Sequence, residues 1–205
     1  MRCTWRQIIM ARKSSRTLWA AKLKGGSLPV ASSVDLPTGL NSRAYRGLVL
    51  GIDPSLRGTG LAVVGFAPPA APRLLFSRTL KMPPRLSMAA CLGGIAEAVT
   101  QVLDQFAIED VAMEQTIYVQ NFQTAQILGA ARGAAIAVPA MRGLPVAEYP
   151  PLRVKQSVTG YGRASKEQMG AMIKNLLMLP DHLPFDESDA AGVAVCHAYT
   201  VRQPR

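Results

Sequence analysis

Cysteine is scarce in this chain of 205 residues. Its three cysteines, at positions 3, 91 and 196, have neither the pairing nor the close spacing of disulfide scaffolds and zinc sites. Long hydrophobic runs are also missing: no stretch of about 18 apolar residues occurs, because the Ala-rich segment 130–141 contains Arg132 and Pro139. These absences argue against a disulfide framework, a thiolate metal site and an integral membrane protein, and they suit a reducing compartment.

Acidic residues are nearly absent from the first 46 residues, which contain nine lysines and arginines but one acid, Asp35. From residue 47 on, 14 basic groups face 12 acidic ones, so most of the net charge of +10 belongs to the first segment. That segment also lacks a sustained helical or strand period. We therefore expect residues 1–46 to form a poorly ordered extension outside the folded domain, 47–205, and their removal to leave activity intact.

The composition of residues 1–46 leaves several roles open. Few acids together with Arg and Ser fit an organellar transit peptide, and the same charge fits a basic arm that adds nonspecific DNA affinity. A start assigned too far upstream or a solvated tail fits equally well. A secretory signal does not fit, because the apolar cluster Ile8-Ile9-Met10 is too short.

The segment from residue 47 on can build a hydrophobic core, since 49% of the whole chain is hydrophobic and 18% is charged. Short apolar runs bounded by turn residues predict strands, and apolar residues at helical spacing predict helices. The expected strands are 48–52, 61–66, 73–80, 110–114 and 145–149, and the expected helices are 86–106, 124–138, 166–179 and one that starts near residue 186. This order predicts an α/β fold with a mixed sheet and helices on its faces.

Four acids occupy positions that suggest a shared site. Asp53 and Glu114 each end an apolar strand, and the carboxyl edge of an α/β sheet is where such folds place their sites. Asp186 and Asp189 are three residues apart and share one face of a helix. Four converging carboxylates repel one another unless cations lie among them, and oxygen ligands without Cys or His suit Mg²⁺ or Mn²⁺. This pattern is typical of a two-metal phosphodiester hydrolase.

Each acid also has a simpler interpretation. Asp186 or Ser188 can cap the last helix, Asp53 before a proline can form a turn, and Glu114 can be an exposed strand end. The four acids in this order are far less expected by chance than any one of them.

Five short motifs stand out along the chain. They are Leu50-Gly-Ile-Asp53-Pro-Ser-Leu-Arg-Gly-Thr-Gly60, Met113-Glu114-Gln115, Leu128-Gly-Ala-Ala-Arg-Gly133, Val154-Lys-Gln-Ser-Val-Thr-Gly160 and Asp186-Glu-Ser-Asp189. In order and spacing they resemble the RuvC family of Holliday junction resolvases, over about residues 48–197. The resemblance implies an RNase H-like fold, with a five-stranded mixed sheet and helices on both faces. It also implies a homodimer that makes paired symmetric nicks in four-way DNA junctions during recombination and repair.

The resemblance further implies the chemistry and the setting. Its catalytic and metal-binding acids fall on Asp53, Glu114, Asp186 and Asp189, with two Mg²⁺ ions per site and Mn²⁺ expected to substitute. The products would carry 5′-phosphate and 3′-hydroxyl ends. RuvA and RuvB, the branch-migration proteins, are the implied partners, and a bacterial cytoplasm is the implied location.

The DNA contacts that the resemblance implies are Lys155, Lys166, Arg57, Ile117 and Tyr118. The family often has an aromatic residue at position 117, where it stacks on a base, and here that residue is Ile117 with Tyr118 beside it. Because stacking on a base contributes about 1–3 kcal/mol, we expect an altered sequence preference rather than lost catalysis. After Asp53-Pro the family usually has Gly-Ser where this chain has Ser55-Leu56, a change expected to do little harm.

Other features carry weaker expectations. Helix 126–138 presents Gly129 and Gly133 among alanines, a surface that suits either packing on the sheet or the dimer contact of the resembling family. We interpret Cys196 and His197 as residues that fill space in the core or at the surface, not as metal ligands.

Three alternatives stay open beside junction resolution. They are an RNase H-like nuclease with another substrate, such as RNA in hybrids, a non-catalytic module that binds branched DNA, and an actin-like ATP-binding domain. The last is disfavoured because such proteins need a second domain with its own phosphate loop.

Overall fold

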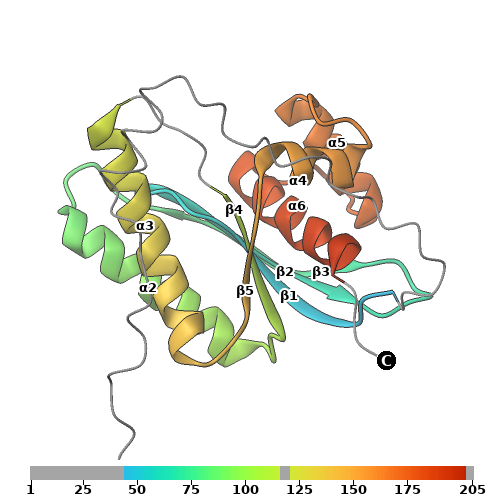
Figure 1. Ribbon diagram of the computed structural model, residues 1–205, viewed down its shortest axis with the longest axis horizontal. Helices are drawn as coiled ribbons and strands as arrows, with labels where there is room; N and C mark the ends of the chain where they lie inside the picture. The colour runs from blue at the N-terminus through green and yellow to red at the C-terminus, as the bar shows by residue number, and fades with distance from the viewer. Residues whose placement is uncertain (1–43, 116–120, 202–205) are drawn as a thin grey trace, which may run out of the picture. The chain divides into compact units, whose positions relative to one another are not determined.

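The computed structural model describes residues 44–115 and 121–201, which form a mixed sheet between two layers of helices (Figure 1). The elements in chain order are β1 (Gly47–Asp53), β2 (Gly58–Phe66), β3 (Arg73–Lys81), α2 (Met88–Gln105), β4 (Asp110–Glu114), α3 (Phe122–Met141), β5 (Val146–Tyr149), α4 (Pro151–Thr159), α5 (Lys166–Leu176) and α6 (Phe185–Thr200). The expected five-stranded mixed sheet with helices on both faces is confirmed. Among the described helices, none has the length and apolar character needed to cross a bilayer.

The sheet has the strand order β3-β2-β1-β4-β5. Strands β1, β2 and β3 pair antiparallel as consecutive hairpins, whereas β4 and β5 run parallel to β1. Ile52 of β1 pairs with Met113 of β4, so the next residues, Asp53 and Glu114, end their strands side by side at the same edge of the sheet. The parallel pairing therefore positions the first two candidate acids.

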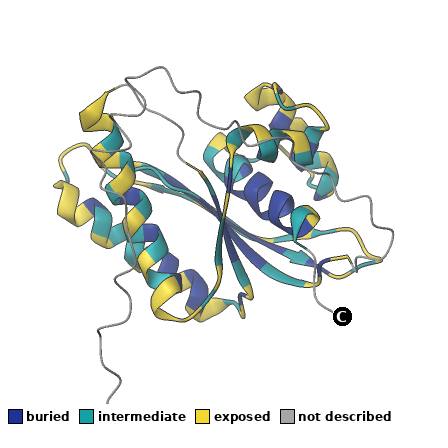
Figure 2. Cartoon of the chain, viewed as in Figure 1, coloured by how far each residue is buried: buried dark blue, intermediate teal, exposed yellow. Residues whose placement is uncertain are grey.

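Both faces of the sheet are buried, which explains the continuous apolar runs of its central strands (Figure 2). Helices α2 and α3 cover one face, and α4, α5 and α6 cover the other (Figure 1). On β1, Leu50 and Ile52 pack toward α2 and α3, while Val49, directly before Leu50, joins the cluster around α6. The alternation of a strand thus serves two hydrophobic cores at once.

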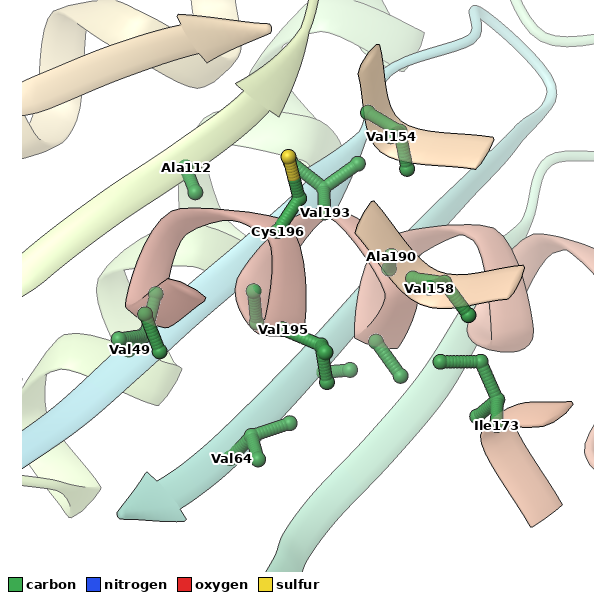
Figure 3. Packing of buried hydrophobic residues seen from close by; sticks show 14 of the residues in the cluster. Val49, Val64, Ala112, Val154, Val158, Ile173, Ala190, Val193, Val195 and Cys196 are labelled. Atoms are coloured by element: carbon green, nitrogen blue, oxygen red, sulfur yellow. The ribbon is translucent and has the colours of Figure 1, made fainter. Parts of the chain in front are cut away.

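Helix α6 is the most deeply buried helix of the second layer, and valines of α4, β1 and β2 surround it (Figure 3). It lies unusually close to β1, because a methyl group added at Gly51 would lie 1.9 Å from the Ala190 carbonyl oxygen. Glycine at that strand position is therefore required for the observed packing. The close contact fixes α6, and the acids of its first turn, against the carboxyl edge of the sheet.

The helices differ from the expected ranges at several points; α5, for example, ends at Leu176 and not at 179. Helix α4 was not expected; Pro151 occupies its first turn, where a missing N–H is tolerated. Val154 and Val158, four residues apart, then bury one face of α4. Helix α3 continues past its expected end at 138 through Pro139, which is buried within the helix.

The folded body begins earlier than the expected boundary at residue 47. Tyr45 is only 3% exposed, and its ring packs edge-on against Phe66 and His197. Its hydroxyl donates a hydrogen bond to Asp110 at 2.5 Å. Tyr45 was assigned to the extension because nothing in the sequence marks it, whereas its contacts place it in the core. Residues 1–43 lie outside the described residues.

Candidate active site

Two strand ends supply the first acids of the site. Asp53 ends β1 and Glu114 ends the adjacent parallel strand β4. Both side chains line one cavity of about 360 Å³ at the carboxyl edge of the sheet. The expectation that these two carboxylates meet is confirmed.

The first five residues of α6 supply the other two acids, Asp186 in the first turn and Asp189 just after it. Asp189 lines the same cavity as Asp53 and Glu114. Asp186 lies beside the cavity, over the start of β2, where a methyl group added at Gly58 would approach its Oδ2 to 3.4 Å. All four acids are close enough for Asp186 and Asp189 to affect the ionisation of Asp53.

The acids disfavour one another's charge. The pKa of Asp53 is raised to about 7, first by burial and then by the negative charges of Asp189, Glu114 and Asp186. The pKa of Glu114 is also raised, by burial and then by Asp189, although nearby lysines oppose the shift. The site therefore carries negative charge that its own residues do not fully balance.

Two lysines border this negative site. Lys155 of α4 and Lys166, the first residue of α5, line the cavity together with the acids. Lys166 Nζ lies 3.2 Å from Asp189 Oδ2, and this contact raises the pKa of the lysine. The positive charge of Lys155 acts on Glu114 and opposes the rise of its pKa. Both lysines thus lie beside the acids at the same cavity.

The donor set suits a hard divalent cation. Carboxylate oxygens from β1, β4 and α6 converge on one cavity, and no Cys or His lines it among the described residues. Burial and, after it, repulsion between the acids raise the pKa of Asp53 and Glu114, and a bound cation would relieve the repulsion. As placed, no three acidic, His or Cys side chains of the described part form a ready-made ion site, and Asp189 contacts Lys166 instead.

The loop after Asp53 is held by its own side chains. The Thr59 hydroxyl donates to the Ser55 carbonyl at 2.6 Å, and the Gly58 N–H donates to Ser55 Oγ at 2.9 Å. Ser55, one of the two departures from the family pattern, therefore stabilises the turn that follows the first acid.

Arg57 points to the protein itself. Its guanidinium donates to the carbonyl oxygens of Pro83 and Leu86, at 2.5 and 3.2 Å, and so holds the connection between β3 and α2. Arg57 is not among the residues that line the cavity. A DNA contact by Arg57 stays a prediction, beside this structural role.

Two predicted DNA contacts, Ile117 and Tyr118, lie outside the described residues. The structure adds Gln115, which lines the cavity directly after Glu114 and donates its backbone N–H to the Tyr149 carbonyl at 2.7 Å. In the sequence, only the position of Gln115 next to an acid that ends a strand indicated a place in the site.

Comparisons with known proteins agree with this geometry. The profile of the family described as "Crossover junction endodeoxyribonuclease RuvC" matches residues 49–197. A curated protein of that name from Halorhodospira halophila is 41% identical over 151 residues, which are 74% of this chain and 89% of the relative.

Solved structures give the same result. T. thermophilus RuvC in complex with Holliday junction substrate aligns with a TM-score of 0.71 and 33% identity, over 75% of this chain and 94% of that one. The yeast mitochondrial Holliday junction resolvase Ydc2 aligns over 77% of this chain and 82% of its own, with a TM-score of 0.53 and 12% identity, which supports the fold alone.

Proposed function

The chain belongs to the RuvC family of crossover junction endodeoxyribonucleases, and on that premise we propose how its residues act on DNA. Its function is the resolution of four-way DNA junctions. The observation that supports this proposal most is the convergence of Asp53, Glu114 and Asp189 on one cavity with Lys155 and Lys166 at its rim.

The four carboxylates are the proposed metal ligands and catalytic acids. Asp53 and Glu114 hold fixed positions at the strand ends, and Asp186 and Asp189 complete the set from α6. Two Mg²⁺ ions, for which Mn²⁺ substitutes, supply activation of a water and stabilisation of the leaving 3′ oxygen when bound. The products are 5′-phosphate and 3′-hydroxyl ends.

The lysines are the proposed phosphate contacts. Lys166 is 62% exposed along its side chain, so its ammonium group can leave Asp189 and meet a DNA phosphate when cations neutralise the acids. Lys155 of α4, next to Glu114, contacts the phosphate backbone of the DNA. Such contacts fix the register of the DNA without reading its bases. Ile117, Tyr118 and Arg57 are the further proposed DNA contacts.

A homodimer would let two sites cut opposed strands. One face of α3 supports this proposal, because Phe122 is 74% exposed and methyl groups added at Gly129 or Gly133 would meet nothing within 4 Å in this chain. The open glycines disfavour the alternative that this face packs on its own sheet. They leave room for the close approach of a second helix.

The dimer proposal has a matched test. Gly133→Arg is expected to weaken dimerisation strongly, since the added side chain projects from the exposed face of α3 without touching its own fold. Gly93→Arg on α2, an equally open position, is the control. Light scattering coupled to size exclusion gives the mass of each variant. A dimer that survives Gly133→Arg, or dissociates equally with Gly93→Arg, contradicts the assignment of this face.

The remaining proposals concern the setting of the enzyme. RuvA and RuvB are the proposed partners, and a bacterial cytoplasm is the proposed location, with organellar targeting by the extension as the alternative. We place the nuclease domain after the extension and include Tyr45 in the nuclease domain. A chain that lacks residues 1–43 is expected to fold and cut junctions, and loss of either property contradicts this boundary.

Cleavage of a labelled synthetic four-way junction tests the function. Reactions with Mg²⁺ contain the junction, a linear duplex or an RNA/DNA hybrid, each with the wild type or Asp186→Asn. Paired symmetric nicks with ligatable ends, on the junction alone and only with the wild type, are expected. Preferred cutting of the hybrid supports the nuclease with another substrate, and tight junction binding without cutting in Mg²⁺ or Mn²⁺ supports a binding module.

A further inference from the structure

The first turn of α6 touches a different neighbour with each successive residue. A methyl group added at Gly60 would lie 2.0 Å from the carbonyl oxygen of Asp186, so the helix start rests directly on β2. Ser188 is buried toward α5, where a methyl group at Gly170 would lie 3.8 Å from its hydroxyl. Asp189 faces Lys166. The direction of both acids therefore depends on how this turn is rotated about the helix axis.

The start of α6 has no side-chain cap to fix that rotation. Pro184 occupies its N-cap position and makes no side-chain hydrogen bond. Helices α2, α3 and α5 begin differently, because each has a polar cap residue whose side chain accepts a backbone N–H. These caps are Ser87, Asn121 and Ser165. Contacts with neighbouring elements therefore hold the first turn of α6, and its contact with Gly60 of β2 is one of them.

Glu187, between the two acids, makes that contact with the outer strand. Its Oε2 accepts a hydrogen bond from the Ser77 hydroxyl at 2.6 Å. Its Oε1 accepts from the Thr79 backbone N–H at 3.0 Å and from the Thr79 hydroxyl at 3.3 Å. Ser77 and Thr79 are two residues apart on β3, so they share one face of the sheet. Both oxygens of Glu187 are engaged, unlike those of a carboxylate available to a metal ion.

We propose that Glu187 is a positioning residue, whose hydrogen bonds to Ser77 and Thr79 hold the first turn of α6 so that Asp186 and Asp189 face Asp53 and Glu114. Consecutive helix residues point about 100° apart, so fixing Glu187 on β3 also fixes the directions of its neighbours. Glu187 does not touch the reacting atoms. This inference rests on the proposed function of the four acids. The contact of Glu187 with Ser77 and Thr79 can nevertheless be measured whether or not that function is correct.

Removal of the carboxylate is the first test. In Glu187→Ala we expect the cleavage rate of bound junction to fall by about 10-fold to 100-fold, the range typical when a partner that orients metal ligands is lost. The Mg²⁺ concentration for half-maximal rate should rise, and calorimetry without DNA should show weaker Mn²⁺ binding. Junction affinity without metal should not change, since no phosphate contact is removed.

Rescue separates the hydrogen bonds from the charge. Glu187→Gln keeps an oxygen that accepts from Thr79 and an amide that pairs with the Ser77 hydroxyl, so it should retain most of the rate. Ser77→Ala breaks the same link from β3 and should reproduce part of the loss. Because both changes act on one contact, the Glu187→Ala and Ser77→Ala effects should not add. Glu97→Ala, an exposed glutamate on α2, is the control.

A direct readout needs neither metal nor activity. The Thr79 amide donates to Glu187, so its hydrogen exchange should accelerate in Glu187→Ala and stay protected in Glu187→Gln. Should Glu187→Ala not fold, the cleavage rate and the Mg²⁺ dependence of Ser77→Ala, which breaks the other hydrogen bond of Glu187, keep the proposal testable.

Several results would overturn the proposal. Wild-type rate and Mg²⁺ dependence in Glu187→Ala would show that the link positions nothing. Equal losses in Glu187→Gln and Glu187→Ala would assign the effect to charge, and additive losses with Ser77→Ala would separate the two residues. A wild type that binds Mn²⁺ but does not cut junctions contradicts the proposed function instead, while the exchange and Mn²⁺ comparisons still decide the role of Glu187.

Discussion

Strand β4 and helix α6 each have polar groups at both ends. At one end these groups contact one another, whereas at the other end acids face further acids. Asp110 begins β4, where it accepts a hydrogen bond from Tyr45 and lies 3.5 Å from His197 Nε2 near the end of α6. The other ring nitrogen of His197 is 2.9 Å from the Tyr149 hydroxyl. The polar groups of this cluster thus contact one another, although His197 Nε2 makes no hydrogen bond within the described part of the chain. Glu114, at the other end of β4, faces further acids.

This difference separates stability from function. Buried polar groups stabilise a fold when they satisfy one another, and they oppose folding when like charges are held together. At the acid end the chain keeps carboxylates that repel one another, and burial together with this repulsion raises the pKa of Asp53 to about 7. We interpret this unbalanced charge as the binding energy available to cations. The two ends should therefore respond in opposite ways to mutation.

The largest expected effect is that of Asp53→Asn. Cleavage should fall by more than about 100-fold, because loss of a metal ligand removes several kcal/mol of transition-state stabilisation. The metal-free protein should nevertheless be at least as stable as the wild type, since a repelling charge is gone. Junction cleavage and thermal unfolding in EDTA check the two outcomes. A strongly destabilised variant would contradict the comparison.

The same substitution predicts a pH dependence. With the Asp53 pKa raised from 3.8 to about 7, the folded state keeps a proton that the unfolded state loses within that interval. The wild type therefore loses stability as pH rises through it, and Asp53→Asn lacks this contribution. Unfolding in EDTA at about pH 5 and about pH 8 measures the difference in slope. Parallel slopes would mean that Asp53 ionises normally.

Tyr45→Phe should have an intermediate effect, confined to stability. The change removes the hydrogen bond to Asp110 and should destabilise the fold by about 1–2 kcal/mol, with cleavage unchanged below the melting temperature. Tyr199→Phe, at a residue that is 54% exposed, is the control. Denaturant unfolding and junction cleavage are compared. Loss of cleavage in folded Tyr45→Phe would show that the two ends are not independent.

The smallest expected effect concerns His197. Burial lowers its pKa below 6.5, although the charge of Asp110 opposes the shift. The unfolded state therefore binds a proton at His197 more readily than the folded state does. The free energy of unfolding falls as pH drops below 6.5, by at most about 1.4 kcal/mol per pH unit. His197→Gln, which keeps a polar partner for Tyr149, should remove this slope. Thermal unfolding of both proteins at several pH values below 6.5 measures the slope. An unchanged slope in His197→Gln would show that other groups cause the loss of stability.

The fold and the acids were predictable where the signal is local. Asp53 and Glu114 end apolar strands, and the three-residue spacing of Asp186 and Asp189 requires only helical geometry. Asp186 nevertheless lies beside the cavity rather than in its lining. Its exact direction depends on the contact of α6 with Gly60, which the spacing does not contain.

The contacts that the sequence did not reveal join distant segments. Tyr45 meets Asp110 across 65 residues, and Glu187 meets Ser77 across 110. No local pattern distinguishes these side chains from ordinary surface residues, because their partners are set by the packing of the sheet. Helix α4 was missed for a local reason, since a proline in a first turn resembles a proline that breaks a helix.

Mg²⁺-dependent thermal stabilisation tests the central claim most directly, namely that the acid end holds unbalanced charge for cations. Melting temperatures of the wild type, Asp53→Asn and Tyr45→Phe are measured as Mg²⁺ is added, without DNA. The account predicts a rising melting temperature for the wild type and for Tyr45→Phe, from its lower starting value, and little change for Asp53→Asn. Equal stabilisation of all three proteins, or none of the wild type, would contradict it.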